Sequence, residues 1–549
     1  MHMSMDHRIS RQAEPRSTAA AERLRSAAIL LAFTLAAAAG SGFAAEPKLR
    51  AVIVDGVNNH DWAAGTIAIR TILEGTGRFT VDGATYPKLP DFSRYDVVID
   101  NFNGGHTETG TRWPADAERA LEAYLRGGGG MVVFHAANNA FLQWPEYNRM
   151  IGLGWRDNSF GPGIAIGPNG HAVTIPKGEG LPPGHGPRHD FDVFVMDKDH
   201  PITRGLPAHW LHPSEQLTHG QHGPAEGLTI LTYAFSEVSR QGEPMDWIRD
   251  YGKGRVYTTM LGHTWTNEPN PNLDDVNFQA LFARGVEWAA SGKVTLPPDL
   301  GWKPLFNGKN LDGWEVRGPG VWTVMQDGVL MGQRAHPQPE APFDVPPSST
   351  RQAGTPASGT PASGTPPVAT PPVATPPVAT PWPIDEKHFR DWLYRQAWLY
   401  TKAEFGEFDL HLEYWIPPGA NSGVSIRDRS RAHSAIGEAD SERPELASFQ
   451  KTTPAHIGYE IQIADEDGEQ FGSGSVYTFV PAKTGLQRRG EWNSLEIESR
   501  NDLIRVRING QIAAVYPGDP ARSKSGPIGL QLHDQFTLAL FRNIRIRQR

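Results

Sequence analysis

The sequence predicts a two-domain protein in which an α/β domain with a parallel sheet precedes an all-β sandwich. In the first half, buried-strand runs alternate with helical patterns, which is typical of a parallel α/β sheet. In the second half, short alternating runs are separated by turn signals, as in antiparallel sandwiches. A Pro-rich repeat interrupts this second half and lacks the apolar residues of a core.

The N-terminal segment is expected to direct export. Arginines precede an apolar run at 27–39, and small residues follow around Gly42 and Ala44, as in a secretory signal. Residues 1–44 are therefore predicted to be a signal peptide, with an uncleaved membrane anchor as the alternative. Since the run is short for a spanning helix, the mature chain is expected to be periplasmic or secreted, without membrane contact.

Composition restricts the classes of function. The 549-residue chain has a formal net charge of −9 and no long run of Lys or Arg, which argues against a nucleic-acid binder. It contains no cysteine, so disulfides, thiol catalysis and a cysteine-linked lipid anchor are excluded. The expected partner is a small molecule.

The first domain is predicted over residues 47–298. Its elements are strand runs at 49–54, 95–100 and after the glycines at 127–130, and helical patterns at 63–74 and 115–126. Ligands of open α/β sheets bind beyond the carboxyl ends of the strands. His60, Asp61 and His135 fall at those ends, so they are the candidate binding residues of this domain.

Several motifs of this domain carry a family resemblance. They are NNHDW at 58–62, GGGMVVFHAANNAF at 128–141, WPEYNRMIG at 144–152, HPITRGLP at 200–207, EPMDW at 243–247, YGKGRVYTTMLGH at 251–263 and EWAASGKVT at 287–295. In these the chain resembles the ThuA-like (trehalose-utilisation) family. The resemblance implies a class I glutamine amidotransferase-like fold and a role in sugar metabolism.

The same resemblance adds His263 and Glu215 to the polar candidates at the sheet edge. Glu215 stands in SEQLTHG, which departs from the more acidic D-E-L-Y-like run expected there. An amidotransferase of this fold has its nucleophile in the turn after the third strand. This chain has His135 there and no cysteine, so glutamine hydrolysis is rejected.

No residue is assigned as a metal ligand. His185 and His189 have a spacing of four, which on a helix would suit a metal. The Gly and Pro of GHGPRHDF exclude a helix there. No cofactor is firmly implied, and a divalent metal stays an open alternative.

A low-complexity segment at 340–383 is predicted to be disordered and extended. It contains GTPAS twice and PPVAT three times, and it is too polar and Pro-rich to bury a core. Strand-like GVWTVMQDGVLMG precedes the segment and AWLYTKAEFGEFDLHLEYW follows it. We therefore predict a loop inserted into a second domain that spans residues 301–549.

The strand predicted at 456–463, HIGYEIQI, places His456, Glu460 and Gln462 on one polar face, because side chains alternate along a strand. Three further runs show the same alternation. Their polar sides carry His411, Glu413 and Trp415; Asn421, Gly423, Ser425 and Arg427; and Gln531 and His533. If the four strands share one sheet, they form one wide polar face suited to a sugar. The alternative is an ordinary solvated face.

This second half also carries a family resemblance. The motifs are LFNGKNLDGWEV at 305–316, WLYTKAEFGEFDLHLEYWIPPGANSGVSIR at 398–427, GYEIQI at 458–463, GEWNSLEI at 490–497, IRVRINGQ at 504–511, and IGLQLHD followed by FRNIRI. They resemble the 3-keto-disaccharide hydrolase domain family. The resemblance implies a concanavalin-like (jelly-roll) sandwich and cleavage of the glycosidic bond of 3-keto-disaccharides or glycosides.

A ketone at C3 acidifies the C2 proton, so a modest base can remove it and the C1 substituent can leave by elimination before water adds. The expected base is Glu460, His456 or His533, and Arg427 or Gln462 is expected to polarise the ketone oxygen. The expected sugar-binding residues are Gln462, Glu413, Trp415, Asn421 and Gln531. Two alternatives stay open: Glu413 and Glu460 acting as the carboxylate pair of an ordinary glycosidase, or Trp415 serving as the stacking platform of a non-catalytic carbohydrate-binding protein.

Overall fold

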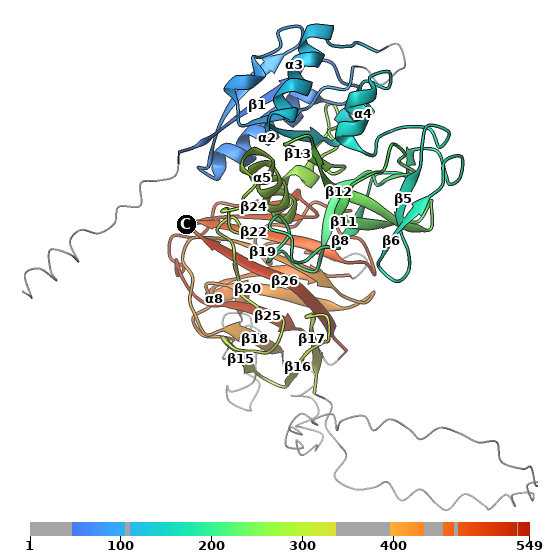
Figure 1. Ribbon diagram of the computed structural model, residues 1–549. Helices are drawn as coiled ribbons and strands as arrows, with labels where there is room; N and C mark the ends of the chain where they lie inside the picture. The colour runs from blue at the N-terminus through green and yellow to red at the C-terminus, as the bar shows by residue number, and fades with distance from the viewer. Residues whose placement is uncertain (1–46, 105–109, 336–395, 433–453, 466–469, 535) are drawn as a thin grey trace, which may run out of the picture. The chain divides into compact units, whose positions relative to one another are not determined.

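The computed structural model describes residues 47–549 except 105–109, 336–395, 433–453, 466–469 and 535 (Figure 1). The predicted signal peptide and the predicted repeat at 340–383 lie outside the described residues. Among the helices that are described, none has the length and apolar character needed to cross a membrane.

The first half builds a sheet whose parallel part has the strand order β2-β1-β3-β4-β13. These strands are β1 (Leu49–Asp55), β2 (Phe79–Thr85), β3 (Val97–Asp100), β4 (Gly130–Phe134) and β13 (Gly254–Thr259). The helices are α2 (Trp62–Gly75), α3 (Ala115–Arg126), α4 (Pro145–Ile151) and α5 (Val276–Ser291), with 3-10 turns η1 (Phe92–Arg94), η2 (His135–Asn139) and η3 (Pro271–Asp274). The predicted parallel α/β sheet is confirmed for these strands.

The central strands are apolar on both sides because helices cover both faces of the sheet. In β1, Ala51 and Ile53 join a core with α2 and α5, whereas Val52 and Val54 join a second core with α3 and α4. Continuous apolar runs such as AVIV therefore form buried strands and not one-sided ones.

Beyond β13 the sheet continues with antiparallel pairing in the order β12-β11-β8-β9. These strands are β12 (Gln241–Tyr251), β11 (Thr229–Ser236), β8 (His189–Val195) and β9 (His209–Glu215). Smaller strands are β5 (Gly163–Ile166), β6 (Ala172–Ile175), β7 (Gly184–His185) and β10 (Thr218–His219). His185 and His189 lie on strands, so the exclusion of a helix there is confirmed.

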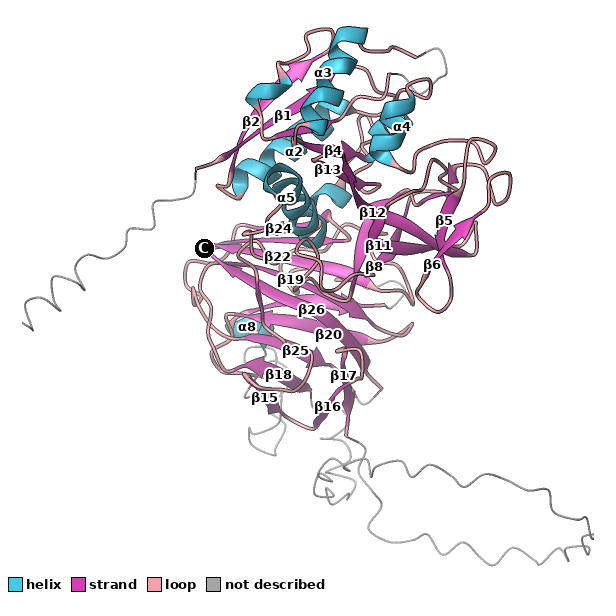
Figure 2. Cartoon of the chain, in the orientation of Figure 1, coloured by secondary structure: helices cyan, strands magenta, loops and turns pink. Residues whose placement is uncertain are grey.

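The second half forms two antiparallel sheets, and the described helices of the chain lie mainly in the first half (Figure 2). The larger sheet contains β16 (Gly320–Val324), β17 (Leu330–Arg334), β26 (Leu538–Gln548), β19 (Phe408–Trp415), β22 (Asn493–Arg500), β23 (Leu503–Ile508) and β24 (Gln511–Tyr516) in that order, with β14 (Lys303–Pro304) on β26. The smaller sheet contains β15 (Trp314–Arg317), β18 (Ala397–Thr401), β25 (Ile528–Leu532), β20 (Asn421–Ile426) and β21 (Tyr459–Ala464).

One apolar core lies between these two sheets, with Leu410 and Ile497 from the larger sheet and Val424, Ile461 and Leu530 from the smaller one. The predicted all-β sandwich is therefore confirmed. The hairpin between β23 and β24 turns at Asn509 and Gly510, whose φ values are +50° and +72°. Positive φ at both central residues is what an Asn-Gly turn supplies.

The predicted strand HIGYEIQI is too long at its start. His456 lies in the short helix α8 (Pro454–Ile457), and β21 begins at Tyr459. Gly458 N donates to Pro454 O at 2.9 Å, which closes the helical turn. A Cβ on Gly458 would lie 2.4 Å from Ile426 O, so only glycine allows this close approach to β20. The alternation argument therefore holds from Tyr459 onward and does not reach His456.

Candidate functional site

The outer face of the smaller sheet gathers polar and aromatic side chains, and we call it the Glu460 face. Glu460 and Gln462 lie on β21, opposite Ser425 and Gly423 of β20. Gln531 lies on β25, opposite Trp398 of β18. The intervening residues of these strands, including Leu399, Leu530, Val424 and Ile461, point into the core of the sandwich, so the named residues point away from it.

Glu460 is only 4% exposed. Burial disfavours the charged form of Glu460 and is the main reason that its pKa is raised to about 7. The nearby charge of Asp428 also raises this pKa, whereas the charge of His533 and a hydrogen bond with Gln531 lower it. A carboxyl group with a pKa near neutrality is half ionised at physiological pH. Such a group can accept a proton and later return it.

Gly423 makes room for the two polar side chains that approach each other over β20. A Cβ at this position would lie 3.0 Å from Glu460 Oε1 and 3.1 Å from Gln531 Oε1. A larger residue would therefore push at least one of these side chains away. The glycine brings the carboxyl group and the amide to one point on the sheet.

Two further predicted residues belong to the same face. Gln462 and Asn421 are both buried, and Gln462 Nε2 lies 3.5 Å from Asn421 Oδ1. His533 directly follows β25, with Nδ1 3.5 Å from Asp534 Oδ2. The structure thus brings Glu460, Gln462, Gln531 and Asn421 onto one face, with His533 at the end of the neighbouring strand.

The sequence reasoning missed the aromatic wall of this face. Trp398 and Tyr400 are fully buried on β18 and stack at 5.6 Å. Tyr400 Oη donates to Asp428 Oδ2 at 2.9 Å, and Asp428 also accepts from Ser430 and from Ala432 N. The alternation in WLY, with Trp398 and Tyr400 two residues apart, could have predicted that both rings lie on one face of the strand.

Three predicted residues are held away from the Glu460 face. Arg427 follows β20 with a φ of +61°, which ends the alternation, and its guanidinium donates to Ser499 Oγ and Asn501 O at 2.7 Å. Glu413 and Trp415 lie on β19 of the larger sheet. The expectation of one polar sheet with four strands is therefore wrong for β19.

The contacts of the two β19 residues explain their roles. Glu413 is fully buried and accepts from Arg542 Nε at 2.6 Å and from Asn543 Nδ2 at 2.7 Å, so it is a structural ion-pair partner. Trp415 Nε1 donates to Gly490 O at 2.9 Å. The side chain of His456 lies outside the described residues.

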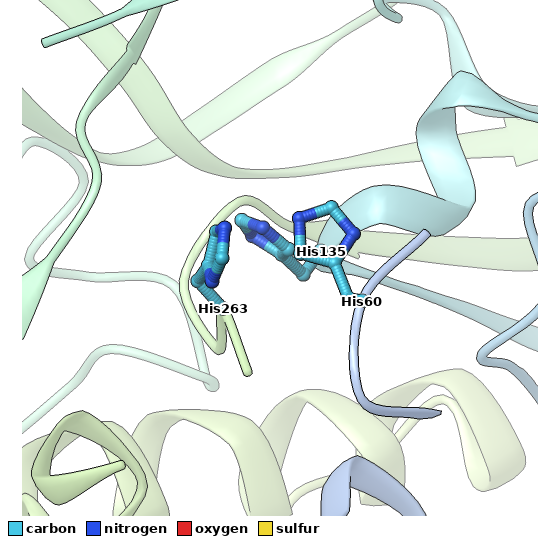
Figure 3. Close-up of side chains that lie close together, drawn as sticks. All are labelled: His60, His135 and His263. Atoms are coloured by element: carbon cyan, nitrogen blue, oxygen red, sulfur yellow. The ribbon is translucent and has the colours of Figure 1, made fainter. Parts of the chain in front are cut away.

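A second cluster lies at the carboxyl edge of the α/β sheet and consists of His60, His135 and His263 (Figure 3). His60 follows β1, His135 follows β4 directly with a φ of +44°, and His263 follows β13. The ring centroids lie 4.2 to 5.0 Å apart. The structure thus brings together three residues that were predicted to meet at this edge.

Hydrogen bonds fix the tautomers of two of these rings. His135 Nδ1 lies 2.6 Å from Met260 O, and His60 Nδ1 lies 3.1 Å from the side-chain oxygens of Asn58 and Asn59. Since these oxygens only accept, each Nδ1 carries the proton and each Nε2 carries a lone pair. Burial lowers the pKa of His135, and it lowers the pKa of His263 to about 3.

The acidic neighbours hold the backbone of this cluster. The Asp61 side chain accepts a hydrogen bond from Ala64 N at 3.0 Å, so its carboxylate forms the N-cap of α2. Glu215 is fully buried and accepts from Gly262 N at 2.8 Å and His263 N at 3.1 Å. Glu215 therefore positions the loop that carries His263.

Comparisons with known proteins agree with this division of the chain. Residues 50–289 match the family model ThuA, trehalose utilisation, and residues 390–547 match the 3-keto-alpha-glucoside-1,2-lyase-like domain. The two matches define a carbohydrate-active enzyme built from two domains. The first half of the chain belongs to the ThuA family, and residues 390–547 are similar to the 3-keto-alpha-glucoside-1,2-lyase-like family.

Similar solved structures include a ThuA-like protein from Parabacteroides merdae ATCC 43184, with 36% identity, 46% of this chain and 93% of that chain covered, and a TM-score of 0.43. A protein from Parabacteroides distasonis ATCC 8503, described as a glycosyl hydrolase, has 22% identity, coverages of 45% and 99%, and a TM-score of 0.26. A Bacillus subtilis protein of galectin-like fold has 9% identity, coverages of 45% and 94%, and a TM-score of 0.26. No curated protein matches the chain.

Proposed function

We propose that this protein is an exported enzyme that cleaves the glycosidic bond of 3-keto-disaccharides or related 3-keto-glycosides at the Glu460 face. The observation that carries the proposal is the buried carboxyl group of Glu460, whose pKa is raised to about 7. The matched family is described as acting on 3-keto-α-glucosides in a 1,2-lyase reaction, which supports elimination. Export is proposed from the N-terminal sequence alone, where arginines precede an apolar run.

The reaction proceeds by proton abstraction. The Glu460 carboxylate takes the proton from C2, and the electron pair of the C–H bond forms the enolate of the C3 ketone. The enolate then expels the substituent at C1 as an alkoxide, which takes a proton from water, and a double bond between C1 and C2 conjugated to the ketone remains. The resulting hydroxide adds to C1, and protonated Glu460 returns its proton to C2, which gives net hydrolysis.

Neighbouring amides support this chemistry. Gln531 and Gln462 are buried beside Glu460 and carry N–H donors that suit the oxygen of a developing enolate. A site screened from water strengthens such hydrogen bonds. Arg427 has no part in this step, because its guanidinium is bound to Ser499 and Asn501.

Two other functions fit the contacts less well. An ordinary glycosidase needs a second carboxylate beside Glu460, but Glu413 lies on the other sheet in an ion pair with Arg542. Asp428 already accepts hydrogen bonds on both oxygens. For a carbohydrate-binding protein, the expected platform Trp415 lies on β19 and not on the Glu460 face.

The test is turnover of matched disaccharides with and without a C3 ketone. The wild-type protein is expected to cleave only the 3-keto form, and Glu460→Gln is expected to reduce kcat by about a hundredfold or more because it removes a positioned base. Glu491→Gln, at an exposed glutamate of the same domain, serves as the matched control and should retain the wild-type rate. Cleavage of the unoxidised form would support the glycosidase, and binding without turnover of either form would support the carbohydrate-binding protein.

A further inference from the structure

We propose that His60, His135 and His263 form a binding site for one divalent transition-metal ion of the zinc type. None of the three histidines takes part in the reaction proposed at the Glu460 face, so this site is a separate property of the α/β domain. We define the three side chains as the histidine cluster.

The spacing of the cluster suits metal coordination. One candidate ligand atom from each histidine lies within 4.8 Å of those of the other two. Nitrogen ligands bind zinc at about 2.0–2.1 Å, so two of them in a tetrahedral site lie roughly 3.4 Å apart. Small side-chain rotations therefore bring all three nitrogens to one ion. Figure 3 shows the three rings gathered at one place, each on a different segment of the chain.

The hydrogen bonds around the cluster are those that orient metal-binding histidines. Such histidines usually donate the second ring N–H to a carbonyl or carboxylate oxygen, which fixes the tautomer. Here Met260 O holds Nδ1 of His135, and the amide oxygens of Asn58 and Asn59 hold Nδ1 of His60. Both rings therefore present Nε2 as a lone pair.

His263 supplies an independent observation. His263 is 8% exposed, and its Nδ1 is buried without a hydrogen-bond partner among the residues that the structure describes. A buried ring nitrogen with no partner is unfavourable unless something fills its place. The His263 ring stacks on Trp265 with the ring centroids 3.9 Å apart, and Glu215 accepts a hydrogen bond from the His263 backbone N–H.

Charge and access fit a cation. The buried carboxylate of Glu215 accepts a hydrogen bond from the backbone of His263, and its negative charge favours a positive ion beside this loop. His60 is partly exposed, whereas His135 and His263 are buried, so an ion enters on the His60 side. Three protein ligands leave a further coordination position for water or a substrate oxygen. Imidazole ligands suit zinc, copper, nickel and iron better than magnesium or calcium.

The test uses the full chain purified without a histidine tag. After chelation and dialysis, titration with Zn²⁺ followed by calorimetry should show one ion per chain, and mass spectrometry of metal content should show the same stoichiometry. Co²⁺ should give visible absorption bands of a low-symmetry nitrogen site. Zn²⁺ should also raise the melting temperature, because it binds the folded state.

Variants assign the site to these residues. His60→Ala is the primary variant because His60 is partly exposed, and it should weaken Zn²⁺ binding at least tenfold; His135→Ala and His263→Ala should do the same. His171→Ala, at an exposed histidine of the same domain, should bind as the wild type does. The proposal is overturned if the wild-type chain binds no Zn²⁺, Co²⁺ or Ni²⁺ below about 100 µM, or if His60→Ala and His263→Ala, folded by circular dichroism, retain wild-type affinity.

Discussion

Replacing Glu460 with glutamine should stabilise the folded protein above neutral pH while it removes activity. Glutamine has the shape of the protonated carboxyl group but cannot ionise. In the wild-type protein, the pKa of Glu460 rises from an ordinary 4.5 to about 7 because the site is buried. The folded protein therefore binds this proton more tightly than the unfolded chain does.

The sign and the size follow from this difference. The stability that goes with the raised pKa is fully present below pH 4.5 and is lost as the pH rises through about 7. At about 1.36 kcal/mol per pKa unit, the loss at pH 8 approaches about 3 kcal/mol. Glu460→Gln escapes this loss, so the variant and the wild type should differ little at pH 4 and most at pH 8.

The assay is denaturant and thermal unfolding of both proteins between pH 4 and pH 9. At pH 8 the melting temperature of Glu460→Gln should exceed that of the wild type by roughly 5 °C or more. Glu491→Gln, at an exposed carboxylate, should show no such pH-dependent gain. A variant that is less stable than the wild type at pH 8, or a gain of the same size at pH 4 and pH 8, would refute the assignment of a buried, near-neutral carboxyl group.

Two further variants test the surroundings of the site. Gly423→Ala places a Cβ about 3 Å from the oxygens of Glu460 and Gln531, so kcat on the 3-keto-disaccharide should fall about tenfold. Gly406→Ala is the control, because the nearest atom to its Cβ lies at 3.8 Å, and it should leave kcat unchanged. Equal kinetics of the two variants would contradict the crowding argument. Glu413→Gln removes the negative charge that lies 2.6 Å from the buried guanidinium of Arg542. Chemical denaturation should therefore show a loss of about 2 to 3 kcal/mol, with kcat unchanged within about twofold. A hundredfold loss of kcat would instead support the two-carboxylate glycosidase.

The alternation of side chains could be predicted from the sequence, but the sheet to which each strand belongs could not. Glu460 and Gln462 share a face because both lie within β21, and that is local geometry. Glu413 shows the same alternation in β19, yet long-range pairing with β22 and β26 places it in the other sheet. Local pattern therefore fixed the face of each strand and left the composition of the site open.

Strand ends limited the prediction in the same way. Arg427 continues the alternation of β20 by sequence, but its positive φ turns the chain at that point. His456 precedes Gly458, which must pack against β20 without a side chain. Both departures depend on contacts with residues distant in the sequence, so the local sequence around Arg427 and His456 could not predict them.

The histidine cluster shows the opposite case, because the positions of His60 and His135 followed from topology. In a parallel sheet the carboxyl ends of the strands meet at one edge. His60 and His135 follow β1 and β4, and the adjacent strand β13 brings His263 beside them. What could not be predicted is the chemistry of the cluster: the acceptors Met260 O, Asn58 and Asn59 that orient the rings come from the fold. Sequence order thus supplied His60 and His135, and the family resemblance supplied His263. Only the tautomers and the spacing of these side chains turn a sugar-binding expectation into a proposed metal site.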